Sequence, residues 1–85
     1  MTLRKAHGTP TAEVTAALAL ADEVAAMPLP EAWGRLQEVS EVCLGLVVTV
    51  ASDHEHDAVD RLLTAHQRCI DTLVSRRLAE LGGLH

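Results

Sequence analysis

The sequence predicts an all-α fold of three helices, and three observations lead to this prediction. Apolar residues recur at helical spacing in three separate segments of the 85-residue chain. A pair of prolines near residue 29 and a polar stretch near residue 54 separate these segments. The candidate core consists of Ala, Leu and Val with a single Ile and one aromatic residue, Trp33, and this composition favours closely packed helices over a sheet.

The length allows one domain, with residues 1–8 as an N-terminal tail and residues 9–85 as a single helical-bundle domain. A domain of this size usually needs a metal, a disulfide framework or a partner chain to become stable. Two cysteines are too few for a disulfide framework. A metal or a partner chain therefore remains as a source of added stability.

The first and shortest helix is expected from about residue 10 to residue 26. Thr9 can cap it, and Pro10 suits the first helical position, where the missing N–H would be unpaired anyway. Its apolar stripe is rich in alanine, so this helix buries little surface by itself. The stripe comprises Val14, Ala17, Leu18, Ala21, Val24 and Ala25.

The second helix is expected from about residue 30 to residue 51, because Pro28 and Pro30 end the first one. Apolar residues form a heptad seam along it, and Trp33 is expected to plug the end of the bundle. The seam comprises Leu36, Val39, Cys43, Leu46 and Val50. Residues 46–50 are also rich in β-branched side chains, so a strand is the alternative for this stretch.

Residues 42–51 are apolar on every side of the second helix, as is typical of a helix that is covered all round. One copy of the chain has too little apolar surface to cover them, so the sequence predicts a homo-oligomer, most simply a dimeric helical bundle. Gly45 would permit a close approach of the second chain. The predicted interface comprises Cys43, Leu44, Gly45, Val47, Val48, Ala51 and, on the third helix, Arg77.

The third helix is expected from about residue 53 to residue 81 and should form a long antiparallel hairpin with the second. Ser52 and Glu55 have the spacing of a capping box, in which each side chain bonds the backbone N–H of the other residue. Gly82 and Gly83 match a helix stop signal. The short first helix would leave one end of this hairpin uncovered.

Two groups of residues are candidate metal ligands. In the acidic turn at 53–57, His54 and Asp57 are three residues apart and would share one side of a helix, but they give two ligands where recurrent zinc sites have three or four. Cys43, His66 and Cys69 offer two thiols and an imidazole, which suit a soft ion such as Cu(I) or Zn(II). The more economical interpretation makes both cysteines small core residues.

The trio of Cys43, His66 and Cys69 resembles the Cys-His-Cys site of the copper-sensing helical repressors of the CsoR type, which are small all-helical oligomers. The likeness covers these three residues and no continuous stretch. That family separates its His and second Cys by four positions, whereas His66 and Cys69 are three apart, and it is more basic than this chain. The resemblance implies a metal-responsive regulator.

Composition argues against several classes of function. The net charge is −5, the seven Lys and Arg residues are dispersed, and no Phe or Tyr is present to stack on bases, so nucleic-acid binding is disfavoured. The longest apolar stretch, residues 42–51, is about half of the roughly 20 residues that a membrane span needs. No phosphate-binding loop, nucleophile elbow or zinc-protease motif occurs. We expect a cytoplasmic, non-enzymatic interaction or regulatory module, with the metal-responsive regulator as the alternative.

Overall fold

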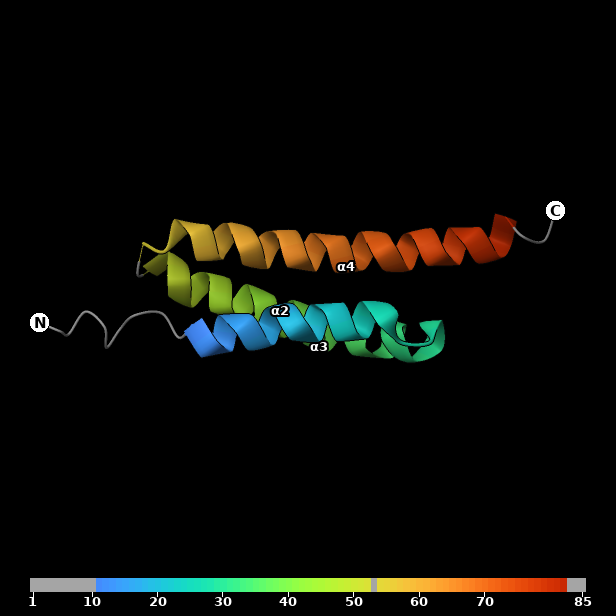
Figure 1. Cartoon of the computed structure of the whole chain (residues 1–85), viewed down its shortest axis with the longest axis horizontal. Coiled ribbons are helices and arrows are strands. Elements are labelled where there is room, and N and C mark those ends of the chain that lie inside the picture. The colour runs from blue at the N-terminus through green and yellow to red at the C-terminus, as the bar shows by residue number, and fades with distance from the viewer. Residues whose placement is uncertain (1–10, 53, 83–85) are drawn as a thin grey trace, which may run out of the picture.

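The computed structural model describes residues 11–52 and 54–82, and this part of the chain folds into a three-helix bundle. The helices are α2 (Thr11–Ala26), α3 (Leu29–Ser52) and α4 (His56–Gly82). Each helix packs against the other two, and α3 runs antiparallel to α2 and α4 (Figure 1). The predicted all-α fold is therefore confirmed. Residues 46–50 lie inside α3, so the strand alternative is wrong.

A tight connection at residues 27–28 joins α2 to α3. The N–H of Met27 donates to the carbonyl oxygen of Val24 (3.1 Å), and the carbonyl oxygen of Pro28 accepts from the N–H of Ala32 (2.8 Å). Helix α3 therefore begins at Leu29, one residue before the predicted start. Pro30 still falls in the first helical turn, where a missing N–H leaves no bond unmade. The predicted cap of the first helix, Thr9 and Pro10, lies outside the described residues.

The C-terminal end of α2 is held against α4 by an arginine. Arg76 of α4 donates a hydrogen bond to the carbonyl oxygen of Ala25 at 2.7 Å. The last carbonyl groups of a helix have no partner within the helix and carry a partial negative charge. The guanidinium of Arg76 satisfies one of these groups and fixes where α2 ends on α4.

The core lies along the line where the three helices meet. The heptad seam predicted for the second helix is confirmed, since Val39, Cys43 and Val50 are fully buried and Leu36 and Leu46 pack against the core. Each fully buried Val or Leu contributes about 1.5–3 kcal/mol relative to an exposed one. The largest fully buried side chains are Leu62, Leu73, Val24, Val39, Val50 and Cys43.

The turn between α3 and α4 differs from the predicted capping box. Ser52 remains in the last turn of α3, where its hydroxyl donates to the carbonyl oxygen of Val48 (3.0 Å). The N–H groups of His54 and Glu55 donate to the carbonyls of Ala51 (3.0 Å) and Val50 (2.9 Å). This is the paired bonding of a Schellman motif, and His54 has the positive φ of 60° that the motif requires.

The burial of Val50 explains the difference. Because Val50 is fully buried, the last turn of α3 is anchored in the core and the helix continues to Ser52. The reversal then involves His54 and Glu55. The carbonyl oxygen of Glu55 accepts the first α4 bond, from the N–H of Val59 at 3.1 Å, so Glu55 is the N-cap residue and α4 begins three residues later than predicted.

The last turns of α4 run past the connection between α2 and α3 (Figure 1). Leu78 and Leu81 in these turns are exposed, as expected for the uncovered end of the hairpin. Trp33 does not plug this end as predicted, because it is 40% exposed. It lies instead at the edge of a shallow hollow that it shares with Leu29, Pro30, Arg77 and Glu80.

Candidate functional site: an apolar face on α3 and α4

The exposed large hydrophobic residues of the described chain are concentrated on α3 and α4. None of them belongs to α2. They range from 40% exposed at Trp33 to 68% exposed at Val48, so water reaches a substantial part of each side chain. The set comprises Trp33, Leu44, Val48, Leu63, Val74, Leu78 and Leu81.

On α3 the exposed apolar residues lie on the side away from α2. Val42 and Leu46 line a groove against α2, and they define the flank of α3 that faces that helix. Successive residues turn by about 100° around a helix, so Leu44 is about 200° from Val42. Val48 follows Leu44 by four residues and therefore shares its side.

On α4 the same geometry holds. Ala65 and Arg68 line a groove against α2 and define the flank of α4 that faces that helix. Leu63 lies about 200° from Ala65 and so points away from α2. Residues 66, 70, 74, 77 and 81 follow Leu63 at spacings of three or four and therefore lie on the same side of α4.

A hydrogen bond shows that the outer sides of α3 and α4 adjoin. Ser40 Oγ lies 2.8 Å from His66 Nε2, and both side chains are half-buried. Ser40 precedes Leu44 by four residues and His66 follows Leu63 by three, so each polar residue belongs to the stripe on its own helix. We call the combined surface the α3–α4 face. It comprises Trp33, Ser40, Leu44, Val47, Val48, Ala51, Leu63, His66, Ile70, Val74, Arg77 and Leu81.

The predicted interface residues divide between this face and other places. Cys43 has no exposed area, so its side chain is not available to a second chain. Gly45 is exposed, but it lines the groove against α2 rather than the α3–α4 face. The members that the α3–α4 face brings together are Leu44, Val47, Val48, Ala51 and Arg77.

Several residues of the face were missed by the sequence analysis. Trp33 is predicted to plug the end of the bundle, and Leu63, Val74 and Leu81 lie outside the predicted interface. The available signal was a second stripe of apolar residues, displaced by one position from the core seam on each helix. A helix with two adjacent apolar stripes can be covered on two sides.

The face is nearly free of charge. Arg77 is its one charged member, and its guanidinium lies 3.3 Å from the carboxylate of Glu80 on the same exposed turn. None of the acidic residues within 11–52 and 54–82 belongs to the face. Such a depletion of charge is characteristic of the buried centre of protein interfaces.

Two of the predicted metal ligands are thiols inside the core. Cys43 and Cys69 are both buried and free. Burial raises the pKa of each thiol. The neighbouring Cys69 raises the pKa of Cys43 further. The charge of Asp22 in turn raises the pKa of Cys69 further. A raised pKa disfavours the thiolate, which is the form that binds metals.

His66 points its Nε2 atom at Ser40. Across residues 11–52 and 54–82, the structure gathers no three His, Cys, Asp or Glu side chains in a way that could hold a metal ion. His54 lies in the turn before α4, so the helical spacing assumed for His54 and Asp57 does not apply.

Comparisons with known proteins add no assignment. No protein-family model, curated protein or solved structure matches the chain. Among the described helices, none combines the length and the apolar character that crossing a membrane requires. The fold and the α3–α4 face together define a small helical bundle with one uncovered apolar side.

Proposed function

We propose that this protein is a non-enzymatic helical interaction module that self-associates, and that two copies pair through their α3–α4 faces. The observation that carries the proposal is the clustering of exposed hydrophobic side chains. Of the seven within residues 11–52 and 54–82, six lie on this one face, and the seventh, Leu78, lies near the C-terminal end of α4. Large apolar patches on small proteins mark interaction sites.

The size of the face suits a dimer interface. The stripe from Trp33 to Ala51 on α3 and the stripe from Leu63 to Leu81 on α4 are each about 27 Å long at 1.5 Å per residue. Each packed helix contributes about 10 Å of width to its stripe. The flat footprint is therefore on the order of 500 Å². Because side-chain relief adds to this figure, it approaches the roughly 800 Å² per partner of a standard interface.

A second copy is the occupant that the chemistry favours. Two α3–α4 pairs laid face to face would form a four-helix core flanked by the two α2 helices, with the two-fold symmetry that is commonest among oligomers. The chain is acidic overall, with a net charge of −5, yet the face has no acidic residue. Pairing therefore buries no carboxylates against one another. The free cysteines are in keeping with a cytoplasmic location.

Sedimentation velocity on a matched pair of variants tests this proposal. Val48 and Thr49 are adjacent and exposed, but Thr49 points about 100° away from Val48. Val48→Asp would bury a charge at the interface, so we expect its dimer dissociation constant to rise at least about a hundredfold. Thr49→Asp should sediment as the parent does. A parent chain that is monomeric at micromolar concentration would overturn the proposal, as would equal behaviour of the two variants.

A further inference from the structure

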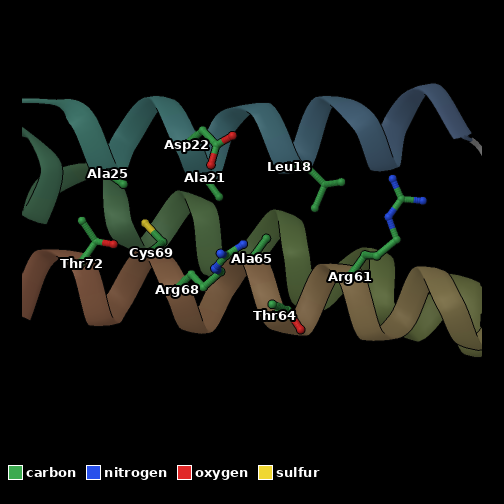
Figure 2. A pocket seen from close by; sticks show the side chains of 10 residues that line it. All are labelled: Leu18, Ala21, Asp22, Ala25, Arg61, Thr64, Ala65, Arg68, Cys69 and Thr72. Atoms are coloured by element: carbon green, nitrogen blue, oxygen red, sulfur yellow. The ribbon is translucent and has the colours of Figure 1, made fainter.

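A second surface feature lies on the opposite flank of α4, where a groove of about 520 Å³ separates α4 from α2 (Figure 2). The groove exists because the residues at its floor are small. Ala21 and Ala25 of α2 face Ala65 and Cys69 of α4. Side chains of this size leave room between two helices that a pair of leucines would fill.

Two arginines of α4 line this groove. Arg61 and Arg68 are seven residues apart, which places them two turns apart on the same side of the helix, about 10 Å along its axis. Figure 2 shows both guanidinium groups directed from α4 towards α2. The groove therefore concentrates positive charge in a chain that is acidic overall.

The other arginines of the described chain are engaged by the protein itself. Arg35 donates to Glu38, Arg76 to the carbonyl of Ala25, and Arg77 to Glu80. Arg61 and Arg68 make no hydrogen bond or ion pair with any residue in 11–52 or 54–82. Within the described residues, the two guanidiniums without a protein partner are thus the two that line the groove.

The remaining polar groups complete a mixed site. Thr64 and Thr72 line the wall, and within the described residues neither hydroxyl has a hydrogen-bond partner, in contrast to Thr49, which donates to a carbonyl in its own helix. The carboxylate of Asp22 faces the groove from α2 (Figure 2). The groove therefore offers donors on α4, one acceptor on α2 and an apolar floor between them.

We propose that this groove binds a small organic anion, either a phosphate monoester or a carboxylate, with a short apolar portion. The planar fork of an arginine matches both oxyanions and binds them through two parallel hydrogen bonds. The apolar portion would lie on the alanine floor. Asp22 accepts a hydrogen bond from a ligand hydroxyl and repels ligands of high negative charge, which distinguishes this site from a binding site for a polyanion.

Calorimetric titration with hexyl phosphate, inorganic phosphate and hexanol tests the proposal on the full chain. Hexyl phosphate should bind more tightly than inorganic phosphate, and hexanol should not bind. Arg61→Gln and Arg68→Gln should each weaken the binding of hexyl phosphate about tenfold, the value of one charged hydrogen bond. Asp22→Asn should strengthen it several-fold, because a like charge is removed.

Arg35→Gln is the matched control, because it removes the same charge at a position outside the groove. Val48→Asp is the second control, since it changes the α3–α4 face and should leave hexyl phosphate binding unchanged. The two proposals therefore stand or fall separately. The anion site is disproved if hexyl phosphate produces no binding at millimolar concentration, if hexanol binds as well as hexyl phosphate, or if Arg68→Gln and Arg35→Gln behave alike.

Discussion

Ser40 Oγ and His66 Nε2 lie 2.8 Å apart and form the one side-chain hydrogen bond that joins α3 to α4 within residues 11–52 and 54–82. The two residues are 26 positions apart in the chain, so the bond fixes how far the antiparallel helices slide along each other. Apolar packing alone specifies this register weakly, because the seams repeat every three or four residues along each helix. A polar pair can be satisfied in one register only.

Removing this bond should cost a measurable part of the stability. Ser40→Ala leaves the half-buried imidazole of His66 without its partner, so the free energy of unfolding should fall by about 1 kcal/mol. Urea denaturation of Ser40→Ala, His66→Ala and the double variant gives the coupling energy of the pair. Ser75→Ala, at an exposed position on α4, is the control and should change little. A coupling energy of zero would mean that the contact does not stabilise the fold.

Leu62 and Leu63 are adjacent but serve different surfaces. Leu62 is fully buried, whereas Leu63 is 43% exposed on the α3–α4 face. Leu62→Ala should lower the unfolding free energy of the chain by about 3 kcal/mol, because it leaves a cavity in the core. Leu63→Ala should cost well under half of that in the monomer and should weaken self-association instead.

Denaturation at low protein concentration and sedimentation at high concentration separate the two effects of these leucine variants. Val48→Asp supplies the monomeric background for the denaturation series. Equal losses of monomer stability in Leu62→Ala and Leu63→Ala would contradict the division into a core side and an interface side. A Leu63→Ala variant that dimerises as the parent does would place the interface elsewhere.

The sequence was sufficient for the fold because the periodicity of the core seam is strong. Val39, Cys43 and Val50 follow one heptad seam, and all three are fully buried. The prolines at 28 and 30 fix the first break by covalent geometry, which no tertiary contact can override. Helix ends are harder to predict, because the spacing of Ser52 and Glu55 fits a capping box although the structure has a Schellman motif there. The burial of Val50 decides the outcome, and burial depends on residues distant in the sequence.

The sequence alone did not predict the composition of the α3–α4 face, for a related reason. Residues 42–51 were correctly identified as having more apolar surface than one side can bury. Which of them face α4, α2 or water depends on where α2 docks, and the alanine-rich stripe of α2 contains little information on this. As a result, the interface predicted from the sequence includes Cys43 and Gly45 and leaves out Leu63. The α2–α4 groove could not be predicted at all, because it arises from small residues on two helices.

His54 offers a direct test of the turn between α3 and α4. Its φ of 60° is a left-handed conformation that costs an L-residue with a side chain about 1–2 kcal/mol. Glycine adopts it without this cost but loses more freedom on folding. His54→Gly should therefore raise the unfolding free energy by about 0.5–1 kcal/mol, and His54→Val should lower it, since β-branched residues tolerate a positive φ poorly.

Urea denaturation of the three chains provides the ranking, with glycine most stable and valine least. His56→Gly is the matched control, because His56 is the first residue of α4 and glycine should not stabilise a helical position. If His54→Gly were less stable than the parent, the turn would not be a Schellman motif in solution.

The two buried thiols should make the stability of the protein fall in alkaline solution. Burial raises the pKa of both Cys43 and Cys69 above the ordinary value, with smaller contributions from Cys69 on Cys43 and from Asp22 on Cys69. Above about pH 8.5 an unfolded thiol loses its proton while a buried one retains it. The unfolded state then binds fewer protons than the native state, so the free energy of unfolding decreases as pH rises.

The stabilising effect of these thiols is complete below the unfolded pKa and is lost progressively until pH passes the raised pKa of the folded protein. Each thiol can contribute a slope of at most about 1.4 kcal/mol per pH unit in this window. The chain contains no Tyr and a single Lys, so few other side chains titrate there. Urea denaturation between pH 7 and about pH 10 measures the slope. The double variant Cys43→Ala/Cys69→Ala should be less stable at pH 7 and nearly independent of pH above it, and an unchanged slope in that variant would assign the effect to other groups.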